Sequence, residues 1–275
     1  MRQRLHLPCL AVALLAAFGL PQPAFSRDAA APAPYLDPAL LPDGAITLPP
    51  PPAPGSPALS LDQQVFLHSR KLKQQDPQRW ALAIGDAQLD SDHLLASFAC
   101  ALGVVLDRGT APGLYRLLDR ASHDTRPQTE AAKDHFAHVR PYIGNDQPIC
   151  VPRHTSLERS PSYPSGHTTL GMSLALILTE LAPDRSTALL ARGRTFGESR
   201  IVCGVHWVSD VQGGYLNAAA LVAVLHSSPA FRADLQQAGR EIATARKHPA
   251  RLPDPASCTA EADARSHSLL FQMQP

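Results

Sequence analysis

Three short segments of this chain combine residue types that can hold and cleave a phosphate ester. In chain order they are Lys133-x6-Arg140-Pro141, Pro164-Ser165-Gly166-His167 and Ser199-Arg200-x5-His206-x3-Asp210. Cations and backbone donors can bind phosphoryl oxygens, one histidine can attack phosphorus, and another can protonate the leaving alcohol. Each segment alone could arise by chance, but their combination in this order indicates phosphoryl-transfer chemistry.

The first segment presents two cations at a helical spacing. Lys133 and Arg140 are seven residues apart, nearly two turns of helix, so both are predicted to emerge on one helix face and converge on one anion. Pro141 disfavours helical backbone at Arg140, which is expected where the helix ends. A solvated basic face would explain an isolated Lys/Arg pair equally well. Arg126, also followed by a proline, lacks such a setting and is interpreted as structural.

The second segment joins a proline-broken loop to an apolar helix predicted to extend to Leu181. Ser165 is placed to cap this helix, and the first backbone N–H groups have no intrahelical partner. Residues 165–167 can therefore cradle phosphate oxygens, and Gly166 permits close approach. A routine capped helix is the alternative, but it leaves His167 unexplained. An imidazole titrates near neutral pH and suits protonation of a leaving oxygen.

The third segment places a histidine and a carboxylate one helical turn apart. His206 and Asp210 can hydrogen-bond directly, which fixes the imidazole tautomer and leaves the other ring nitrogen free to attack phosphorus. Arg200 adds a third cation. An ordinary structural His–Asp pair is the alternative for this spacing alone. Histidines without a matched partner are interpreted as surface or capping residues: His68, His93, His123, His135, His138 and His154.

Helical spacing of apolar residues dominates the sequence from Ser60 onward, and alternating strand patterns are scarce. Prolines at positions 141, 164, 183 and 229 mark helix boundaries. The sequence therefore predicts an all-α fold with a single helical-bundle domain. The later helices are predicted at residues 113–119, 130–140, 166–181, 184–200, 209–226 and 231–247.

Four stretches of the chain are predicted to differ in organisation. Residues 1–26 have a basic start, an apolar run and then small residues, which is typical of a cleaved signal peptide. A membrane anchor is disfavoured because the run is shorter than about 20 apolar residues. Residues 27–58 form a proline-rich leader predicted to be extended polyproline. The helical domain is assigned to residues 59–248 and an irregular tail to 249–275.

Four cysteines remain after removal of the signal peptide: Cys100, Cys150, Cys203 and Cys258. An even number in an exported protein favours two disulfides, and the sequence leaves every pairing open. No spacing typical of a zinc site occurs, so no metal is expected.

The 275-residue chain has a formal net charge of +1 and is 44% hydrophobic. This balance provides no broad basic field for nucleic acid or an anionic membrane. Two apolar stretches, 170–181 and 216–225, are too short to span a bilayer and are predicted to be buried core helices. The mature chain is therefore expected to bind neither nucleic acid nor membrane.

The three segments resemble the phosphatase signature shared by the type 2 phosphatidic acid phosphatase superfamily and the vanadium haloperoxidases. Within that group the chain is most similar to the bacterial class A non-specific acid phosphatases, over roughly residues 45–245. The narrower likeness rests on Leu48-Pro49-Pro50-Pro51-Pro52, Asp62-Gln63, Arg79-Trp80, Asp86-Ala87 and Cys203-Gly204-x-His206-Trp207-x-Ser209-Asp210. Pro161 departs from that class, whose signature begins with glycine at this position.

The resemblance implies a secreted or periplasmic acid phosphatase that hydrolyses phosphate monoesters with broad specificity, without metal or other cofactor. It implies that His206 forms a phosphohistidine, that Asp210 orients it, and that His167 protonates the leaving group. Some phosphotransferase activity would follow, and the enzyme could act as a homodimer. The residues implied to bind phosphoryl oxygens are Lys133, Arg140, Ser165, Gly166, His167 and Arg200.

Two other functions are compatible with the same residues. A vanadium haloperoxidase would share the pocket, because vanadate mimics the pentacoordinate phosphoryl transition state. A non-enzymatic secreted protein could display the proline-rich leader to a partner, but it would have no need of the eight intact site positions. The sequence alone does not indicate which phosphate ester is preferred.

Overall fold

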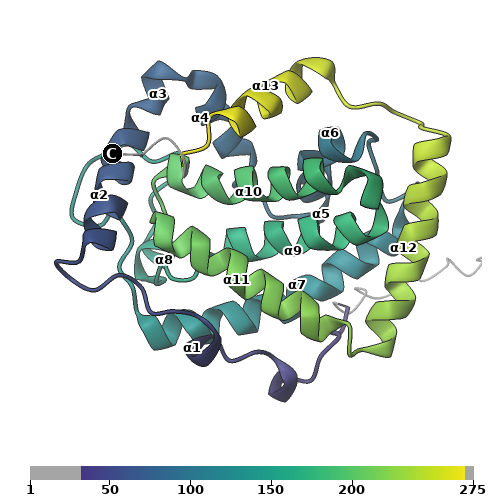
Figure 1. Cartoon of the computed structure of the whole chain (residues 1–275), viewed down its shortest axis with the longest axis horizontal. Helices are drawn as coiled ribbons and strands as arrows, with labels where there is room; N and C mark the ends of the chain where they lie inside the picture. The colour runs from purple at the N-terminus through teal and green to yellow at the C-terminus, as the bar shows by residue number, and fades with distance from the viewer. Residues whose placement is uncertain (1–31, 270–275) are drawn as a thin grey trace, which may run out of the picture. The chain divides into compact units, whose positions relative to one another are not determined.

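The computed structural model describes residues 32–269, so the signal peptide predicted for residues 1–26 lies outside the described residues. Within 32–269 the chain forms helices joined by loops, with no strand (Figure 1). The prediction of an all-α fold is confirmed. The elements are η1 (Pro38–Leu40), α1 (Gly44–Thr47), α2 (Pro57–Arg70), α3 (Leu72–Gln75), α4 (Pro77–Gly85), α5 (Ser91–Ser97), α6 (Ala99–Leu102), α7 (Pro112–Phe136), α8 (Thr155–Arg159), α9 (Gly166–Leu181), η2 (Pro183–Arg185), α10 (Ser186–Cys203), α11 (Val208–Leu225), α12 (Pro229–Lys247) and α13 (Pro255–Ser266).

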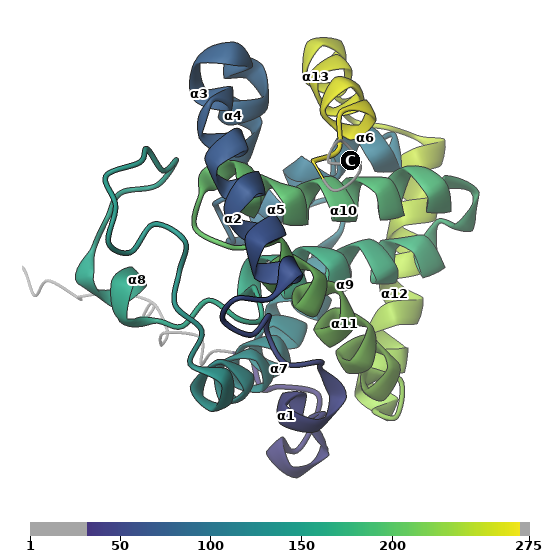
Figure 2. The same ribbon diagram turned by 60° about the vertical axis from the view of Figure 1, so that its left-hand side comes forward.

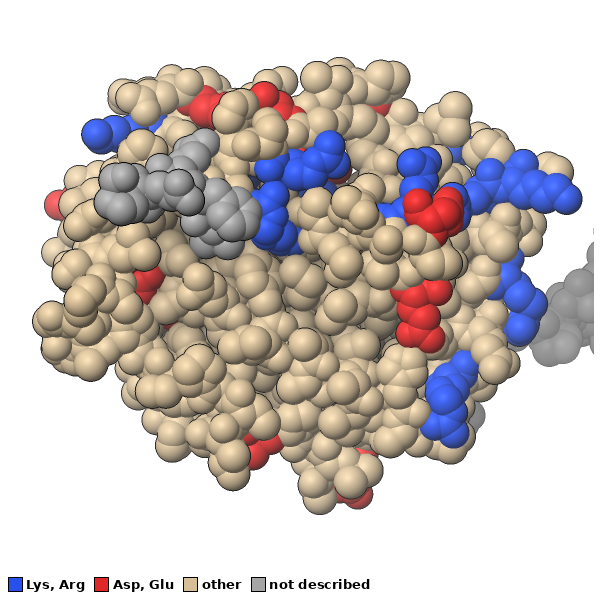
Figure 3. Space-filling view, viewed as in Figure 1, with Lys and Arg blue, Asp and Glu red and all other residues tan. Residues whose placement is uncertain are grey.

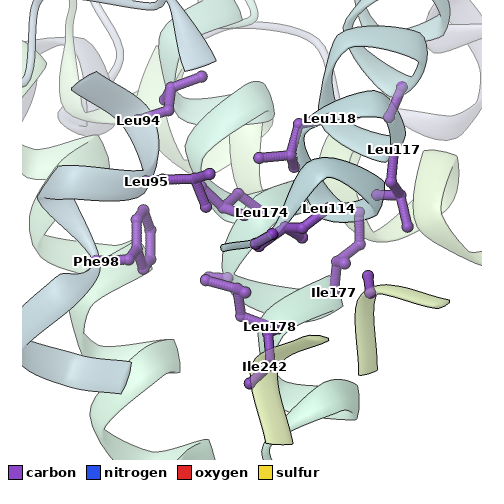
Figure 4. Packing of buried hydrophobic residues seen from close by; sticks show 14 of the residues in the cluster. Leu94, Leu95, Phe98, Leu114, Leu117, Leu118, Leu174, Ile177, Leu178 and Ile242 are labelled. Carbon is purple, nitrogen blue, oxygen red and sulfur yellow. The ribbon is translucent and has the colours of Figure 1, made fainter. Parts of the chain in front are cut away.

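Helix α9 occupies the centre of the bundle. It lies between α10 and α11 and also packs against α7 and α12 (Figure 1). Its apolar side chains meet those of α5, α7 and α12 in one buried cluster (Figure 4). Burial of this kind is the main favourable contribution to folding, at roughly 25 cal/mol per Å² of apolar surface. The cluster includes Leu94, Leu95, Phe98, Leu114, Leu117, Leu118, Leu174, Ile177, Leu178 and Ile242.

Four α-helices begin with the same local signal, a Ser or Asp N-cap followed by proline. The capping oxygen accepts a backbone N–H of the first turn, and proline at the first helical position lacks only an N–H that would be unpaired anyway. Sequence signals of this kind make helix starts easier to predict than helix ends. The pairs are Ser56-Pro57 of α2, Asp76-Pro77 of α4, Ser228-Pro229 of α12 and Asp254-Pro255 of α13.

Helix α7 corrects two of the predictions from the sequence. It is one continuous helix through Pro127, because packing against α9 and α12 outweighs the loss of one backbone hydrogen bond. It ends at Phe136, where Ala137 adopts the left-handed conformation (φ 47°) and its N–H bonds to the Lys133 carbonyl. Arg140 therefore lies in the following loop, and the prediction that it shares a helix face with Lys133 is wrong.

The leader is not uniformly extended. Residues 49–53 contain no helix, but η1 and α1 are single helical turns, and α1 occupies a proline-free stretch capped by Asp43. Two contacts fix the leader to the domain: the backbone N–H of Tyr35 donates to Asp124 (2.9 Å), and the Tyr163 hydroxyl donates to the Pro49 carbonyl (2.6 Å). The prediction of continuous polyproline is therefore wrong for the described part of this segment.

The tail also differs from the irregular segment that the sequence predicted, because Pro255–Ser266 form helix α13. Asp254 caps α13, and a disulfide between Cys100 and Cys258 (Cα–Cα 5.3 Å) ties it to α6. The second disulfide joins Cys150 to Cys203 (Cα–Cα 4.6 Å) and anchors the loop before α8 to the end of α10. The structure thus selects one of the pairings that the sequence left open.

The described residues contain one helix, α11, that is long and apolar enough to cross a membrane by length and composition alone. Half of that helix is buried inside the protein, as the core helix of a globular domain also is. Acidic and basic side chains are interspersed on the face shown in Figure 3, in keeping with the small net charge.

Candidate active site

A cavity of about 520 Å³ collects most of the residues singled out in the sequence. One wall is α7, and others come from the start of α9, the end of α10 and the segment around α8, which stands on the side of the bundle away from α12 (Figure 2). Ser165 and Asp210 lie behind the lining instead of in it. The predicted residues that line the cavity are Lys133, Arg140, Gly166, His167, Arg200 and His206.

Backbone carbonyls hold the Arg140 guanidinium in place. Its Nε donates to the Ser160 carbonyl (2.8 Å), and its Nη1 donates to the Val205 carbonyl (2.9 Å). Nη1 also lies 3.2 Å from Nε2 of His206. Because these contacts fix the fork without neutralising it, the charge of Arg140 remains available to a bound anion.

Two buried guanidinium groups in this site have no carboxylate partner. Neither Arg140 nor Arg200 forms an ion pair within residues 32–269, and Nε of Arg200 is buried without a hydrogen-bond partner. Burial, reinforced by the nearby Arg140, lowers the pKa of Arg200 to about 9. Burying an unpaired cation costs free energy unless an anion compensates the charge. We therefore expect Arg140 and Arg200 to bind an anionic ligand.

Lys133 is a third buried cation of the cavity, beside Arg140 and Arg200. Its ammonium group lies 3.1 Å from Glu130 and 3.4 Å from the Ser160 hydroxyl, and burial lowers the pKa of the amine. Glu130 is half exposed and is the one carboxylate in the lining. The cavity therefore keeps a net positive character.

The N-terminus of α9 faces these cations. The Ser165 hydroxyl accepts the backbone N–H of Thr168 (3.3 Å), so this side chain serves as the helix cap, and the Ser165 N–H donates to the Asp210 carbonyl (2.9 Å). A Cβ added to Gly166 would lie 4.0 Å from Nζ of Lys133 and would project toward the anion site. The glycine leaves that space open.

His167 follows Gly166 in the first turn of α9 and donates from Nε2 to the Ala87 carbonyl (3.1 Å). A carbonyl can only accept, so Nε2 carries a proton and Nδ1 is the remaining nitrogen. Burial lowers the pKa of His167 well below its usual value, and the cations of Arg200 and Lys133 add to this effect. The imidazole is therefore neutral until an anion offsets those charges.

His206 precedes α11, and Asp210 lies in its first turn, so the two do not share a helix face as the spacing had predicted. They nevertheless meet: Nδ1 of His206 is 3.3 Å from Oδ2 of Asp210. Since the Arg140 guanidinium can only donate, Nε2 of His206 must accept from it and Nδ1 carries the proton. Burial, together with Arg140, lowers the pKa of His206 to about 3, which keeps the imidazole neutral, with its Nε2 lone pair directed at Arg140.

Asp210 lies at the centre of a hydrogen-bond network. Its Oδ2 also accepts the backbone N–H of Trp207 (2.8 Å), and its Oδ1 accepts from Nδ1 of His138 (3.0 Å) and the Ser162 hydroxyl (3.2 Å). Burial alone would raise the pKa of this carboxyl, but the hydrogen bonds from His138 and His206 hold it below its usual value. Asp210 is therefore an ionised, fixed acceptor.

Metal ligands do not cluster in the part of the chain that the structure describes, where no three His, Cys, Asp or Glu side chains come close enough to hold an ion. The anion-binding groups of this cavity are instead cationic side chains and the N-terminus of α9.

Comparison with known proteins assigns the family. Residues 122–233 match the family model described as "PAP2 superfamily". An acid phosphatase of Zymomonas mobilis is 44% identical over 224 residues, which cover 81% of this chain and 84% of that protein. The chain belongs to this family of acid phosphatases. The non-specific acid phosphatase of Providencia stuartii is 35% identical over 74% of this chain and 83% of its own length, and that of Salmonella typhimurium is 32% identical over 71% and 78%.

Sequence reasoning missed part of this candidate site. His138, interpreted as a surface or capping residue, instead donates to Asp210 and lies close to the Ser162 hydroxyl (3.2 Å). Arg126, interpreted as structural, lines the cavity. His138 had no partner at a helical spacing because Asp210 is 72 residues away, and only the fold brings the two together.

We expect His138 to act as a positioning residue for Asp210. Replacing it with phenylalanine removes an N–H donor to a buried carboxylate, and should lower kcat about 10- to 100-fold with little change in KM. The variant H138Q keeps an N–H donor and should retain most of the activity. Steady-state kinetics with p-nitrophenyl phosphate checks this, and equal kcat values in both variants would show that the hydrogen bond has no part in positioning.

Proposed function

We propose that this enzyme is an exported acid phosphatase that hydrolyses phosphate monoesters through a covalent phosphohistidine, without a metal ion. The observation that carries the proposal is the pair of buried guanidinium groups without a carboxylate partner, in one cavity with a neutral, oriented imidazole. A dianionic phosphoryl group would supply the missing negative charge. The even set of disulfide-bonded cysteines supports export to an oxidising compartment, the periplasm or the medium.

In the first step, Lys133, Arg140, Arg200 and the N-terminus of α9 bind the phosphoryl oxygens. Arg140 shifts its Nη1 donor from His206 to the substrate, which frees the Nε2 lone pair for attack on phosphorus. The bound phosphoryl dianion favours protonation of His167 at Nδ1, and as the P–O bond to the alcohol breaks, His167 donates that proton to the leaving oxygen. Asp210 stabilises the cationic phosphohistidine through Nδ1 of His206.

In the second step, His167 accepts a proton from water, and the water oxygen attacks phosphorus. The P–N bond breaks and its electron pair returns to Nε2 of His206, which releases inorganic phosphate. The negative charge on the transferring group stays close to the same cations throughout, so they can replace a metal as electrostatic stabilisers. An alcohol in place of water would give phosphotransfer.

A substrate and inhibitor panel tests the proposal. The purified mature chain should release phosphate from p-nitrophenyl phosphate and alkyl phosphates at acid pH, equally with and without a chelator. Loss of activity in the chelator would contradict the metal-independent mechanism. Orthovanadate should inhibit, and bromide oxidation by peroxide in its presence would instead favour the haloperoxidase alternative.

A further inference from the structure

The catalytic cavity is longer than a phosphate group requires, and α7 runs along its length. Lys133 lines its phosphate end, and Thr129, Arg126 and Ser122 line it at intervals of three or four residues toward the start of the helix. This spacing keeps all of these side chains on one face of α7. Since a helix rises about 1.5 Å per residue, Arg126 lies about 10 Å along the axis from Lys133.

Arg126 is an exposed cation facing this cavity without a counterion. It forms no hydrogen bond or ion pair within residues 32–269. Glu130, the one carboxylate of the lining, is bonded to Lys133. Apolar side chains, Leu89 and Leu170, also line the cavity.

We propose that Arg126 binds a second anionic group on the substrate, so that the enzyme prefers phosphate monoesters whose leaving alcohol carries another phosphate or a carboxylate about two helical turns from the scissile phosphorus. This inference rests on the proposed phosphatase function. The Arg126 guanidinium can donate two parallel hydrogen bonds to either anion. Such substrates would extend along α7 from the phosphate end of the cavity, at Lys133, to Arg126. Their apolar part would lie against Leu89 and Leu170.

Matched alkyl esters test this preference. Hexyl phosphate carries one anionic group, 1,6-hexanediol bisphosphate adds a second phosphate at a comparable reach, and 6-phosphonooxyhexanoate adds a carboxylate instead. The parent enzyme should show a kcat/KM for the bisphosphate about three- to tenfold above that for hexyl phosphate, after correction for its two equivalent ends, because an exposed charge pair contributes modestly. The kcat/KM for 6-phosphonooxyhexanoate, compared with that for the bisphosphate, shows which of the two anions Arg126 prefers.

Substitutions at Arg126 should reduce that preference in a graded way. R126Q should bring the ratio of kcat/KM values close to one, mainly through KM for the bisphosphate, and R126E should lower it further. R240Q removes an exposed arginine of α12, outside the cavity, and should leave the ratio unchanged. The preference in the parent should also weaken as ionic strength rises.

Two outcomes would overturn the inference: equal kcat/KM values for the mono- and bisphosphate in the parent, or a ratio that R126Q leaves unchanged. Melting temperatures of the variants show whether each is folded. Failure of the parent to hydrolyse hexyl phosphate or p-nitrophenyl phosphate at all would be a different result, since it would contradict the phosphatase function itself.

Discussion

Replacing His206 with alanine is expected to abolish turnover of phosphate monoesters, lowering kcat by about four orders of magnitude or more. The imidazole is buried, neutral and oriented by Asp210, and we propose that its Nε2 is the atom that bonds to phosphorus. Without it, water would have to attack the phosphoryl group directly. Acid quenching of the parent during turnover should trap an acid-labile phosphoenzyme, and the H206A variant should yield none.

Chemical rescue separates loss of the nucleophile from loss of the fold. Truncation at position 206 leaves space beside Arg140, and added imidazole can enter it and accept the phosphoryl group. Partial recovery of activity with imidazole, together with a melting temperature near that of the parent, is the expected result. A phosphoenzyme trapped from H206A at the parental level would show that another residue forms the covalent bond.

The sequence predicted which residues come together more accurately than it predicted the helices around them. Six of the eight predicted residues line one cavity, because their identities already indicated which charges and nitrogens must meet. The helix assignments that were meant to bring them together were partly wrong. Arg140 and His206 both lie in loops, where backbone contacts such as Arg140 Nε to the Ser160 carbonyl fix their directions. Contacts of this kind have no local signature in a sequence.

Long-range contacts also explain the other errors in the fold. Helix α7 continues through Pro127 because it packs against helices that are distant in the sequence, and α13 is tied to α6 by a disulfide that spans 158 residues. From the local sequence alone, the proline in α7 predicted a break in the helix, and the C-terminal segment was predicted to be irregular. The caps and the apolar periodicity, which are local, gave the correct fold class and most helix starts.

Removing the imidazole of His167 is expected to separate the two chemical steps. In H167A, hydrolysis of alkyl phosphates should fall about 10²- to 10⁴-fold, because a poor leaving group needs a proton. Formation of the phosphoenzyme from p-nitrophenyl phosphate should fall much less, since p-nitrophenolate leaves without one. The second step also lacks its base, so phosphohistidine should accumulate. Rapid-quench measurements would then show a burst of p-nitrophenol followed by slow turnover.

The pH dependence gives an independent test of the same role. Burial and the neighbouring cations lower the pKa of His167 in the free enzyme, and only the protonated form can act as an acid. As the pH rises, that form becomes scarcer, so kcat/KM of the parent for alkyl phosphates should already fall as the pH rises through the acid range.

The bound phosphoryl dianion offsets the charges of Arg200 and Lys133, and should raise the pKa of His167 in the complex. As the pH rises, kcat should therefore fall at a higher pH than kcat/KM does. The burst rate of H167A with p-nitrophenyl phosphate should show neither fall. If the burst rate of H167A falls with rising pH as the parent's does, the titration belongs to another group. That result would then leave His167 as a binding residue for the phosphoryl oxygens alone.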